Sequence, residues 1–140
     1  MTHKVGVTTD TGTCFALRHQ VFVVEQGVPV AEEIDDLDAT ATHLLAWVGA
    51  DPVGAARIVF SEHKAKIGRV CVLADHRGSG LGQALITQAV EVAKTRGATQ
   101  AILGAQLHAL PFYAALGFRA FGPDYDDAGI LHRDMGMDLT

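Results

Sequence analysis

Alternating and helically spaced apolar residues in the first part of the chain predict a short strand and then a helix. Val5 and Val7 alternate with polar neighbours, which is typical of a half-buried strand. Apolar residues then recur through positions 15–22 at helical spacing, and Thr11 and Thr13 are candidate N-caps for that helix. A glycine and a proline a few residues later predict where the helix ends.

Three apolar runs follow, and each is long enough for a strand. They are His43–Val48, Val53–Phe60 and Lys66–Leu73. The segment 49–52, Gly-Ala-Asp-Pro, predicts a hairpin turn between the first two runs. The third run is apolar at nearly every position after Arg69, which is typical of a central strand buried on both faces.

The second half of the chain predicts a long helix between strands. A glycine-containing turn at 75–82 leads into apolar residues at helical spacing from Leu81 to Ala93, with Gly97 as the expected C′ residue. The shorter elements expected after it are a strand, a helix and two strands, at Ala101–Leu103, His108–Leu116, Phe118–Phe121 and Ile130–Leu139. This order predicts an α/β (α+β) fold with a mixed sheet and helices on its faces.

Composition narrows the class of protein. A chain of 140 residues predicts a single domain over 1–140, and 49% hydrophobic with only 19% charged residues excludes a disordered chain. The net charge of −5 argues against nucleic-acid and anionic-membrane partners. No apolar run reaches a membrane span, and the first residues lack the apolar core of a signal peptide. Two cysteines in apolar segments predict buried, reduced thiols and a cytoplasmic protein.

The segment Arg77-Gly78-Ser79-Gly80-Leu81-Gly82 lies between an expected buried strand and the long helix. Glycines there let the backbone bend and let a ligand approach closely. The N-terminus of the helix offers unpaired N–H groups and a partial positive charge. The pattern therefore predicts a cradle for a pyrophosphate group.

Two common phosphate-binding patterns are absent at this turn. A dinucleotide fingerprint needs a glycine at its sixth position, which is Gln83 when counted from Gly78 and Leu85 when counted from Gly80. The Gly-Lys-Ser/Thr of a Walker A motif does not occur in the chain. The residues therefore disfavour both a nicotinamide-dependent enzyme and a nucleoside triphosphatase.

The turn resembles the acetyl-coenzyme A (acetyl-CoA) motif of the GCN5-related N-acetyltransferase (GNAT) family, Arg/Gln-x-x-Gly-x-Gly/Ala. A second family signature, a helical tyrosine followed by Gly-Phe, is matched by Tyr113 and 117–118. The chain is most similar to the ElaA-like branch, and the closer match lies in 21–26, 103–106 and 129–132. Where many relatives have Asn seven residues before the tyrosine, this chain has Gln106.

The resemblance implies the acyl-CoA N-acyltransferase fold, with a mostly antiparallel sheet, and an N-acetyltransferase without a metal. Its reaction would move an acetyl group from acetyl-CoA to a primary amine of a small molecule or peptide, by direct attack in a ternary complex. The implied cofactor-binding residues are Val70, Cys71, Val72, Arg77, Gly78, Ser79, Gly80, Leu81, Gly82, Gln83, Gln106 and Tyr113. Of these, the Val72 N–H is the candidate contact for the thioester carbonyl, and Tyr113 the proton donor to the leaving thiolate.

The base that takes a proton from the acceptor ammonium stays open. The catalytic candidates are Glu25 and His132, and the candidates that would also bind the acceptor are Glu33, Asp35 and His108. A chain of water molecules is an alternative to any single side chain. A thiol nucleophile at Cys71 is disfavoured, because no base accompanies it in the sequence.

Acidic residues gather in two stretches expected to be loops, 32–38 and 124–127. Carboxylates at the acceptor end would make the cleft negative and would favour cationic amines. The alternative is that these residues only keep the surface soluble. A second function also stays open, that of a catalytically idle acyl-CoA sensor, and the sequence leaves a homodimer undecided.

Overall fold

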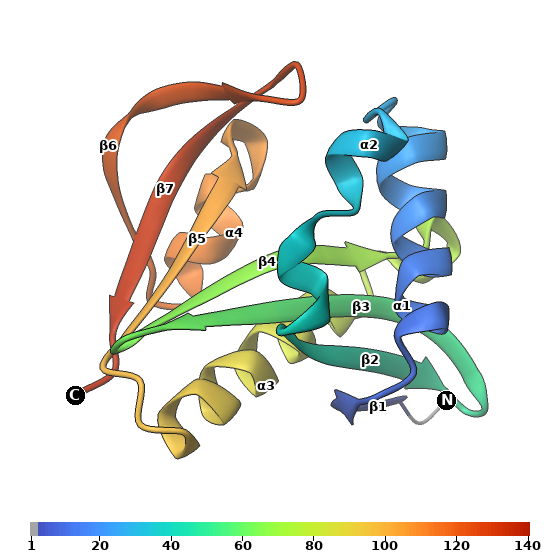
Figure 1. The fold of residues 1–140 in the computed structure, drawn as a ribbon, viewed down its shortest axis with the longest axis horizontal. Coiled ribbons are helices and arrows are strands. Elements are labelled where there is room, and N and C mark those ends of the chain that lie inside the picture. Colours follow the sequence, from blue (N-terminus) through green and yellow to red (C-terminus); the bar gives the residue numbers. More distant parts are fainter. Residues whose placement is uncertain (1–2) are drawn as a thin grey trace.

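The computed structural model describes residues 3–140 and arranges them around a seven-stranded sheet of order β1-β2-β3-β4-β5-β7-β6 (Figure 1). The strands are β1 His3–Thr8, β2 Thr42–Val48, β3 Asp51–Ser61, β4 Lys64–Val72, β5 Gln100–Gln106, β6 Arg119–Asp127 and β7 Ile130–Asp138. The α-helices are α1 Thr11–Arg18, α2 Val30–Glu33, α3 Leu81–Thr95 and α4 Leu110–Ala115. A π-helix, η1 His19–Glu25, continues α1, and short 3₁₀ segments are η2 Asp36–Ala39, η3 Ala74–His76 and η4 Leu107–Ala109.

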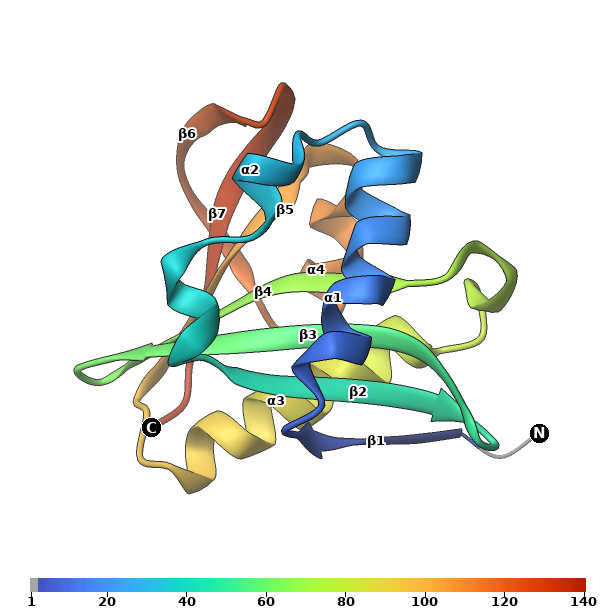
Figure 2. The same ribbon diagram turned by 45° about the vertical axis from the view of Figure 1, so that its right-hand side comes forward.

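Neighbouring strands pair antiparallel except β4 and β5, which run parallel. The predicted mixed, mostly antiparallel sheet with flanking helices is therefore confirmed. Helices α1 and α3 lie on opposite sides of the β2–β4 strands (Figure 2). Successive side chains of these strands divide accordingly: Leu44 and Ala56 pack with α3, whereas Leu45 and Ala55 pack with α1.

The helix predicted from Thr11 forms, but its N-cap is Asp10 and not Thr11 or Thr13. The Asp10 carboxylate accepts from the Thr13 N–H at 3.1 Å, so Thr13 supplies a donor and Asp10 the capping oxygen. The helix widens into η1, where the Gln26 N–H bonds to the Val21 carbonyl at 3.1 Å. Gly27, at a φ of +73°, then ends it as predicted.

Several expectations about strands and loops need correction. The hairpin turn is shorter than 49–52, because β3 already begins at Asp51. The acidic stretch 32–38 is not a loop, since it forms the end of α2 and most of η2, and the stretch 124–127 belongs to β6. Strands β5 and β6 are also longer than predicted.

Strand β4 is central in the sheet, but it is not buried on both faces as predicted. Lys64 and Lys66 are exposed, and Val70 and Val72 are only half-buried. The reason is that β4 pairs with β5 only from Lys64 to Lys66, after which the two strands diverge (Figure 1). No helix within residues 3–140 is long and apolar enough to cross a membrane.

Candidate active site

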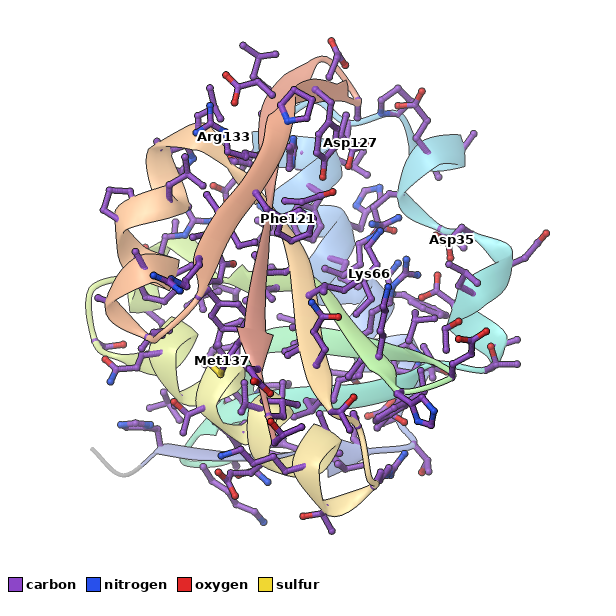
Figure 3. The ribbon with its side chains drawn as sticks, turned by 90° about the vertical axis from the view of Figure 1, so that its left-hand side faces the viewer. Asp35, Lys66, Phe121, Asp127, Arg133 and Met137 are labelled. Carbon is purple, nitrogen blue, oxygen red and sulfur yellow. The ribbon has the colours of Figure 1, made fainter. Side chains whose placement is uncertain are left out.

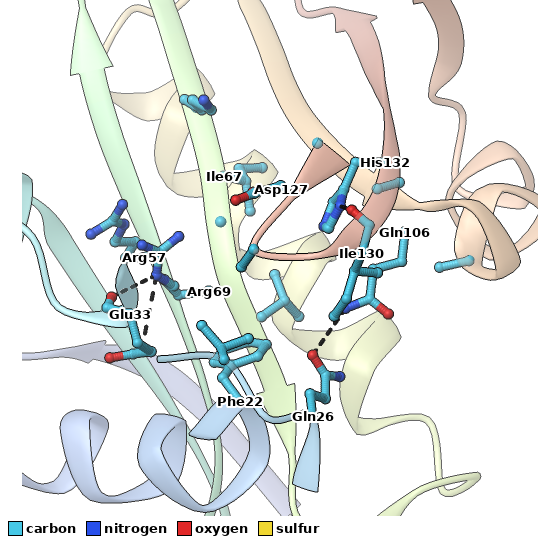
Figure 4. Close-up of a pocket in the computed structure, with 18 of the residues that line it drawn as sticks. Phe22, Gln26, Glu33, Arg57, Ile67, Arg69, Gln106, Asp127, Ile130 and His132 are labelled. Atoms are coloured by element: carbon cyan, nitrogen blue, oxygen red, sulfur yellow. Dashed lines mark hydrogen bonds and ion pairs between the residues drawn. The ribbon is translucent and has the colours of Figure 1, made fainter. Parts of the chain in front are cut away.

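A cavity of about 330 Å³ opens where β4 and β5 separate (Figure 4). Its walls come from η1, from the first turns after η1, from both diverging strands and from the β6–β7 hairpin. Phe22 and Ile67 contribute apolar surface, while Gln106, His132 and Arg69 contribute polar groups. Apolar and polar surface contribute about equally to the lining, and converging polar groups in a cavity are what orient a bound small molecule.

A β-bulge in β4 shapes one wall of this cavity. Arg57 of β3 pairs with Gly68 and Ala55 pairs with Cys71, so two residues of β4 oppose one of β3. The first of the two, Arg69, has a φ of +51°, which is uncommon for a residue other than glycine. The extra residue shifts the alternation of side chains, so Ile67 packs on the α3 side and Cys71 on the α1 side.

The glycine turn has the backbone geometry that a phosphate cradle needs. Gly78 and Gly80 have φ values of +78° and +86°, and a Cβ at either position would meet no atom within 4 Å. Gly80 is the N-cap of α3, and no side chain caps this helix. The N–H groups of its first turn therefore have no capping side chain and can donate to an anion. The predicted turn therefore fits a pyrophosphate group.

Arg77 connects this turn to two other elements. Its Nε donates to the Val72 carbonyl at 2.9 Å, and its guanidinium pairs with the Glu25 carboxylate of η1 at 2.9 Å. Glu25 does not line the cavity. The structure thus places this predicted base in an ion pair with Arg77, away from His132 and Tyr113.

Tyr113 lies on α4 and lines the cavity. Its ring packs edge-on against Phe112 and Phe118, with centroids 5.0 and 6.1 Å away. The hydroxyl has no hydrogen-bond partner among residues 3–140. Burial raises the pKa of Tyr113, so the phenol keeps its proton at neutral pH and can donate it.

His132 faces the cavity from β7 with a defined tautomer. Its Nδ1 lies 2.8 Å from the Ile130 carbonyl, and because a carbonyl only accepts, Nδ1 carries the proton. The unprotonated Nε2 is then free to accept. The imidazole stacks on Tyr125 at 5.9 Å, and the Tyr125 hydroxyl donates to Asp134 at 2.7 Å.

Tyr125 of β6 also explains why position 104 of β5 is a glycine. A Cβ at Gly104 of β5 would collide with the Tyr125 hydroxyl, so only glycine leaves room for this ring. Burial and the neighbouring Asp134 carboxylate raise the pKa of Tyr125, which holds the phenol neutral.

Gln106 and His108 belong to a short chain of hydrogen bonds across the cavity wall. His108 Nε2 lies 2.8 Å from Gln106 Oε1, and Gln106 Nε2 donates to Gln26 Oε1 at 3.0 Å. Because an amide oxygen only accepts, His108 Nε2 carries a proton. Both predicted residues therefore line the cavity, and the amide of Gln106 is held between η1 and η4.

The acidic stretch 32–38 is tied to three arginines in a cluster that is mostly buried. The cluster consists of Arg18, Arg57, Arg69, Glu33, Asp35 and Asp38. Arg18 and Arg57 approach Asp38 at 2.7 and 2.9 Å, and Arg57 approaches Asp35 at 2.7 Å. Burial alone would raise the pKa of Asp38, but hydrogen bonds from these two arginines hold it far below its usual range.

This cluster neutralises three of the five carboxylates of the stretch 32–38, because they meet three guanidinium groups. Glu32 also lines the cavity, and its carboxylate has no ion-pair partner among residues 3–140. Glu33 lines the cavity but is 3% exposed and bound to Arg18, and Asp35 lies outside the cavity lining. Neither carboxylate is placed as a free base.

The two cysteines are buried and free, as predicted. Burial raises the pKa of Cys71 to about 12, so its thiol is not ionised at neutral pH.

Of the predicted cofactor-binding residues at the end of β4, Val70 lines the cavity, whereas Cys71 and Val72 do not. Cavity residues that the sequence did not single out as site residues include Phe22, Gln26, Arg57, Lys66, Arg69 and Tyr125.

Comparison with known proteins agrees with this geometry. A family model described as an acetyltransferase (GNAT) domain matches residues 9–139. The chain belongs to the GNAT acetyltransferase family. YjcF of Bacillus subtilis (strain 168), named as an uncharacterized N-acetyltransferase, is 40% identical over 125 residues, which cover 89% of each protein. ElaA of Escherichia coli (strain K12) is 35% identical over 128 residues, which cover 88% of this chain and 84% of ElaA.

Solved structures of GNAT proteins share the fold. The crystal structure of Escherichia coli ElaA superposes with a TM-score of 0.87 at 29% identity, covering 98% of this chain and 100% of ElaA. An acyl-CoA N-acyltransferase from Pseudomonas aeruginosa superposes with a TM-score of 0.84 at 30% identity, covering 98% of this chain and 99% of the other. The chain is thus an ElaA-like GNAT protein with the acyl-CoA N-acyltransferase fold.

Proposed function

We propose that this chain moves an acetyl group from acetyl-CoA to a primary amine by direct attack in a ternary complex. The observation that carries the proposal is the course of β4, which parts from β5 beyond Lys66 and runs into the uncapped glycine turn of α3. This course supports a track for the pantetheine arm along Val70–Val72 and for the pyrophosphate at 77–82. A GNAT-fold neighbour at 20% identity and a TM-score of 0.75 is described as a Bacillus subtilis acetyltransferase in complex with CoA.

The proposal assigns the proton transfers to two side chains that line the cavity, His132 and Tyr113. His132 Nε2 takes a proton from the acceptor ammonium, and the neutral amine attacks the thioester carbonyl. A backbone N–H of β4 stabilises the oxyanion, and we favour Val70 over Val72 because only Val70 lines the cavity. As the new C–N bond forms and the C–S bond breaks, Tyr113 donates its proton to the departing thiolate. The acetylated nitrogen loses its second proton to water, and a proton from water restores the phenol of Tyr113.

Binding and transfer are tested together by comparing Gly80→Leu with Gly97→Leu. Both glycines have a φ of +86° with open space around them, at opposite ends of α3, so backbone strain lowers stability similarly in both variants. A side chain at position 80 would occupy the phosphate approach, and we expect acetyl-CoA affinity to fall at least tenfold, roughly 1.4 kcal/mol. Gly97→Leu should keep the wild-type affinity.

Calorimetry with acetyl-CoA measures the affinities, and release of the CoA thiol over a panel of primary amines measures transfer. Equal affinities in the two variants would contradict a phosphate-binding site at 77–82. Binding without thiol release or amine acetylation, for every amine, would leave an acyl-CoA sensor and overturn the transferase.

A comparison of His132→Gln with His108→Gln tests the base. At neutral pH we expect His132→Gln to lower kcat/KM by about tenfold, less than full general-base catalysis supplies, because some acceptor is already neutral. The loss should shrink as pH rises towards the pKa of the acceptor amine itself, above which the amine no longer needs a base. His108 has its Nε2 committed to Gln106, so its variant should keep the wild-type pH profile. A pH-independent loss in His132→Gln would make it a packing residue.

A further inference from the structure

Half of the charged side chains that line the cavity are paired with one another or with neighbours, and Lys66 is one of those that are not. Arg57, Arg69 and Glu33 belong to the ion-pair cluster. Lys66 lines the cavity from β4, and its ammonium forms no ion pair or hydrogen bond among residues 3–140. Asp127 of β6 also lines the cavity and has no ion-pair partner among the described residues. Glu32 lines the cavity as well, and its carboxylate is likewise unpaired within residues 3–140. The cavity therefore offers one uncompensated cation and two uncompensated carboxylates in addition to the neutral cluster.

The bulge of β4 brings Arg69 to the face that carries Lys66. Ala65 and Ile67 point to the α3 core, and Lys66 therefore points to the opposite face. Without the extra residue Arg69 would follow Ile67 towards α3, but the shifted alternation sends it towards α2 and η2. Figure 3 shows Lys66 in the opening between β5 and the α2–η2 segment, with Asp127 near the β6–β7 turn.

Arg69 is held in place and keeps a donor free. Its Nε donates to the Glu33 carbonyl at 3.0 Å, and its Nη2 donates to the Glu32 carbonyl and to Asp35, each at 3.3 Å. Nη1 has no partner among residues 3–140. Burial and repulsion from Arg57 and Arg18 lower the pKa of Arg69, so its charge lies in surroundings that an added anion would stabilise.

The other wall of the cavity carries the groups that act on an amine. Arg57 and Arg69 lie along one side, and Gln106 and His132 lie along the other (Figure 4). An ammonium near His132 would also meet the unpaired carboxylate of Asp127. Glu32 is exposed at the rim and uses its carbonyl to hold Arg69. The two walls thus match a small molecule with an anion at one end and an amine at the other.

We infer that the acceptor is a small amine bearing one carboxylate, which binds between Lys66 Nζ and Arg69 Nη1 while the amine faces His132. The inference rests on the proposed acetyl transfer. One uncompensated cation suits a single negative charge better than a phosphate dianion. Guanidinium and ammonium donors bind carboxylates through charge-assisted hydrogen bonds, which are stronger than neutral ones. Free amino acids and the C-termini of short peptides share this chemistry.

The test measures binding of matched product pairs to the CoA-saturated protein, so it does not depend on turnover. The probes are the N-acetyl forms of glycine, leucine, phenylalanine, 4-aminobutyrate and glycyl-leucine, each with its carboxamide. We expect calorimetry to show at least tenfold tighter binding of the carboxylate in one or more pairs. The glycyl-leucine pair distinguishes a peptide terminus from a free amino acid.

The matched variants are Lys66→Gln and Lys64→Gln, because both lysines are exposed on β4 but only Lys66 lines the cavity. Lys66→Gln should reduce the carboxylate preference to threefold or less, and Lys64→Gln should preserve it. The inference is overturned if no carboxylate binds more tightly than its carboxamide, or if the preference survives in Lys66→Gln. Carboxylate-dependent binding without acetylation of any amine would contradict the proposed acetyl transfer and leave the carboxylate site standing. Equal acetylation of amines with and without a carboxylate would contradict the carboxylate site and leave acetyl transfer standing.

Discussion

Replacing Tyr113 by phenylalanine is expected to lower kcat by about ten- to a thousandfold, the scale of general acid catalysis. The change removes one hydroxyl and keeps the ring that packs against Phe112 and Phe118. Since burial raises the pKa of this phenol, the wild-type residue carries its proton throughout the neutral range and can deliver it to the thiolate. Steady-state and single-turnover rates of CoA release would measure the loss.

Two further measurements on the Tyr113→Phe variant are the controls for this prediction. The Kd for acetyl-CoA and the Tm should stay at wild-type values, because the hydroxyl makes no hydrogen bond within residues 3–140 that the variant would lose. A wild-type kcat, under conditions where chemistry limits the rate, would show that Tyr113 only packs. The leaving thiolate would then take its proton from water.

Replacing Asp38 by asparagine is expected to lower the free energy of unfolding by about 3–5 kcal/mol, the usual loss when one partner of a buried ion pair is removed. Asp38 is 7% exposed and accepts from Arg18 and Arg57, so the neutral side chain leaves two buried guanidinium groups undercompensated. The comparison is Asp124→Asn, which removes an exposed pair with Arg133 at 2.7 Å and should cost under about 1 kcal/mol. Urea denaturation of both variants measures the difference.

The pH dependence of stability has a defined sign. Because the folded protein lowers the pKa of Asp38, this carboxylate stabilises the fold above its unfolded pKa of about 3.9, and that contribution is lost as pH falls further. The wild type should therefore lose stability in acid more steeply than Asp38→Asn. Equal stability of wild type and variant at neutral pH would mean that the cluster orders the cavity wall without stabilising the fold.

Local motifs were sufficient to predict the glycine turn before α3 and the helix that carries Tyr113. The turn around Gly80 and the tyrosine at 113 each act through the conformation of a few consecutive residues, which spacing and residue type reveal. His132 was one of several candidates along the chain. Its tautomer depends on the carbonyl of Ile130, and its orientation depends on the stacked ring of Tyr125, so only the folded hairpin distinguishes it from the others.

The acceptor side could not be predicted, because its groups meet over long separations. Asp38 meets Arg18 and Arg57 across 20 and 19 residues, and Asp35 meets Arg57 across 22. Composition alone showed the acids and did not show the arginines that neutralise three of them. The bulge at Arg69 was also hidden, since an arginine carries no sequence signal for a left-handed backbone conformation.

The β4 bulge makes Arg69 and Lys66, the two cations of β4 at the cavity, unequally tolerant of substitution. Arg69 is committed to the fold through the carbonyls of Glu32 and Glu33, and without its extra residue its charge would point into the apolar core beside α3. The side chain of Lys66 makes no hydrogen bond or ion pair within residues 3–140. A substitution there alters the cavity and leaves the backbone pairing of β4 with β3 and β5 in place. We therefore expect single substitutions at position 66 to change which acceptor binds, whereas substitutions at position 69 should also disturb the fold.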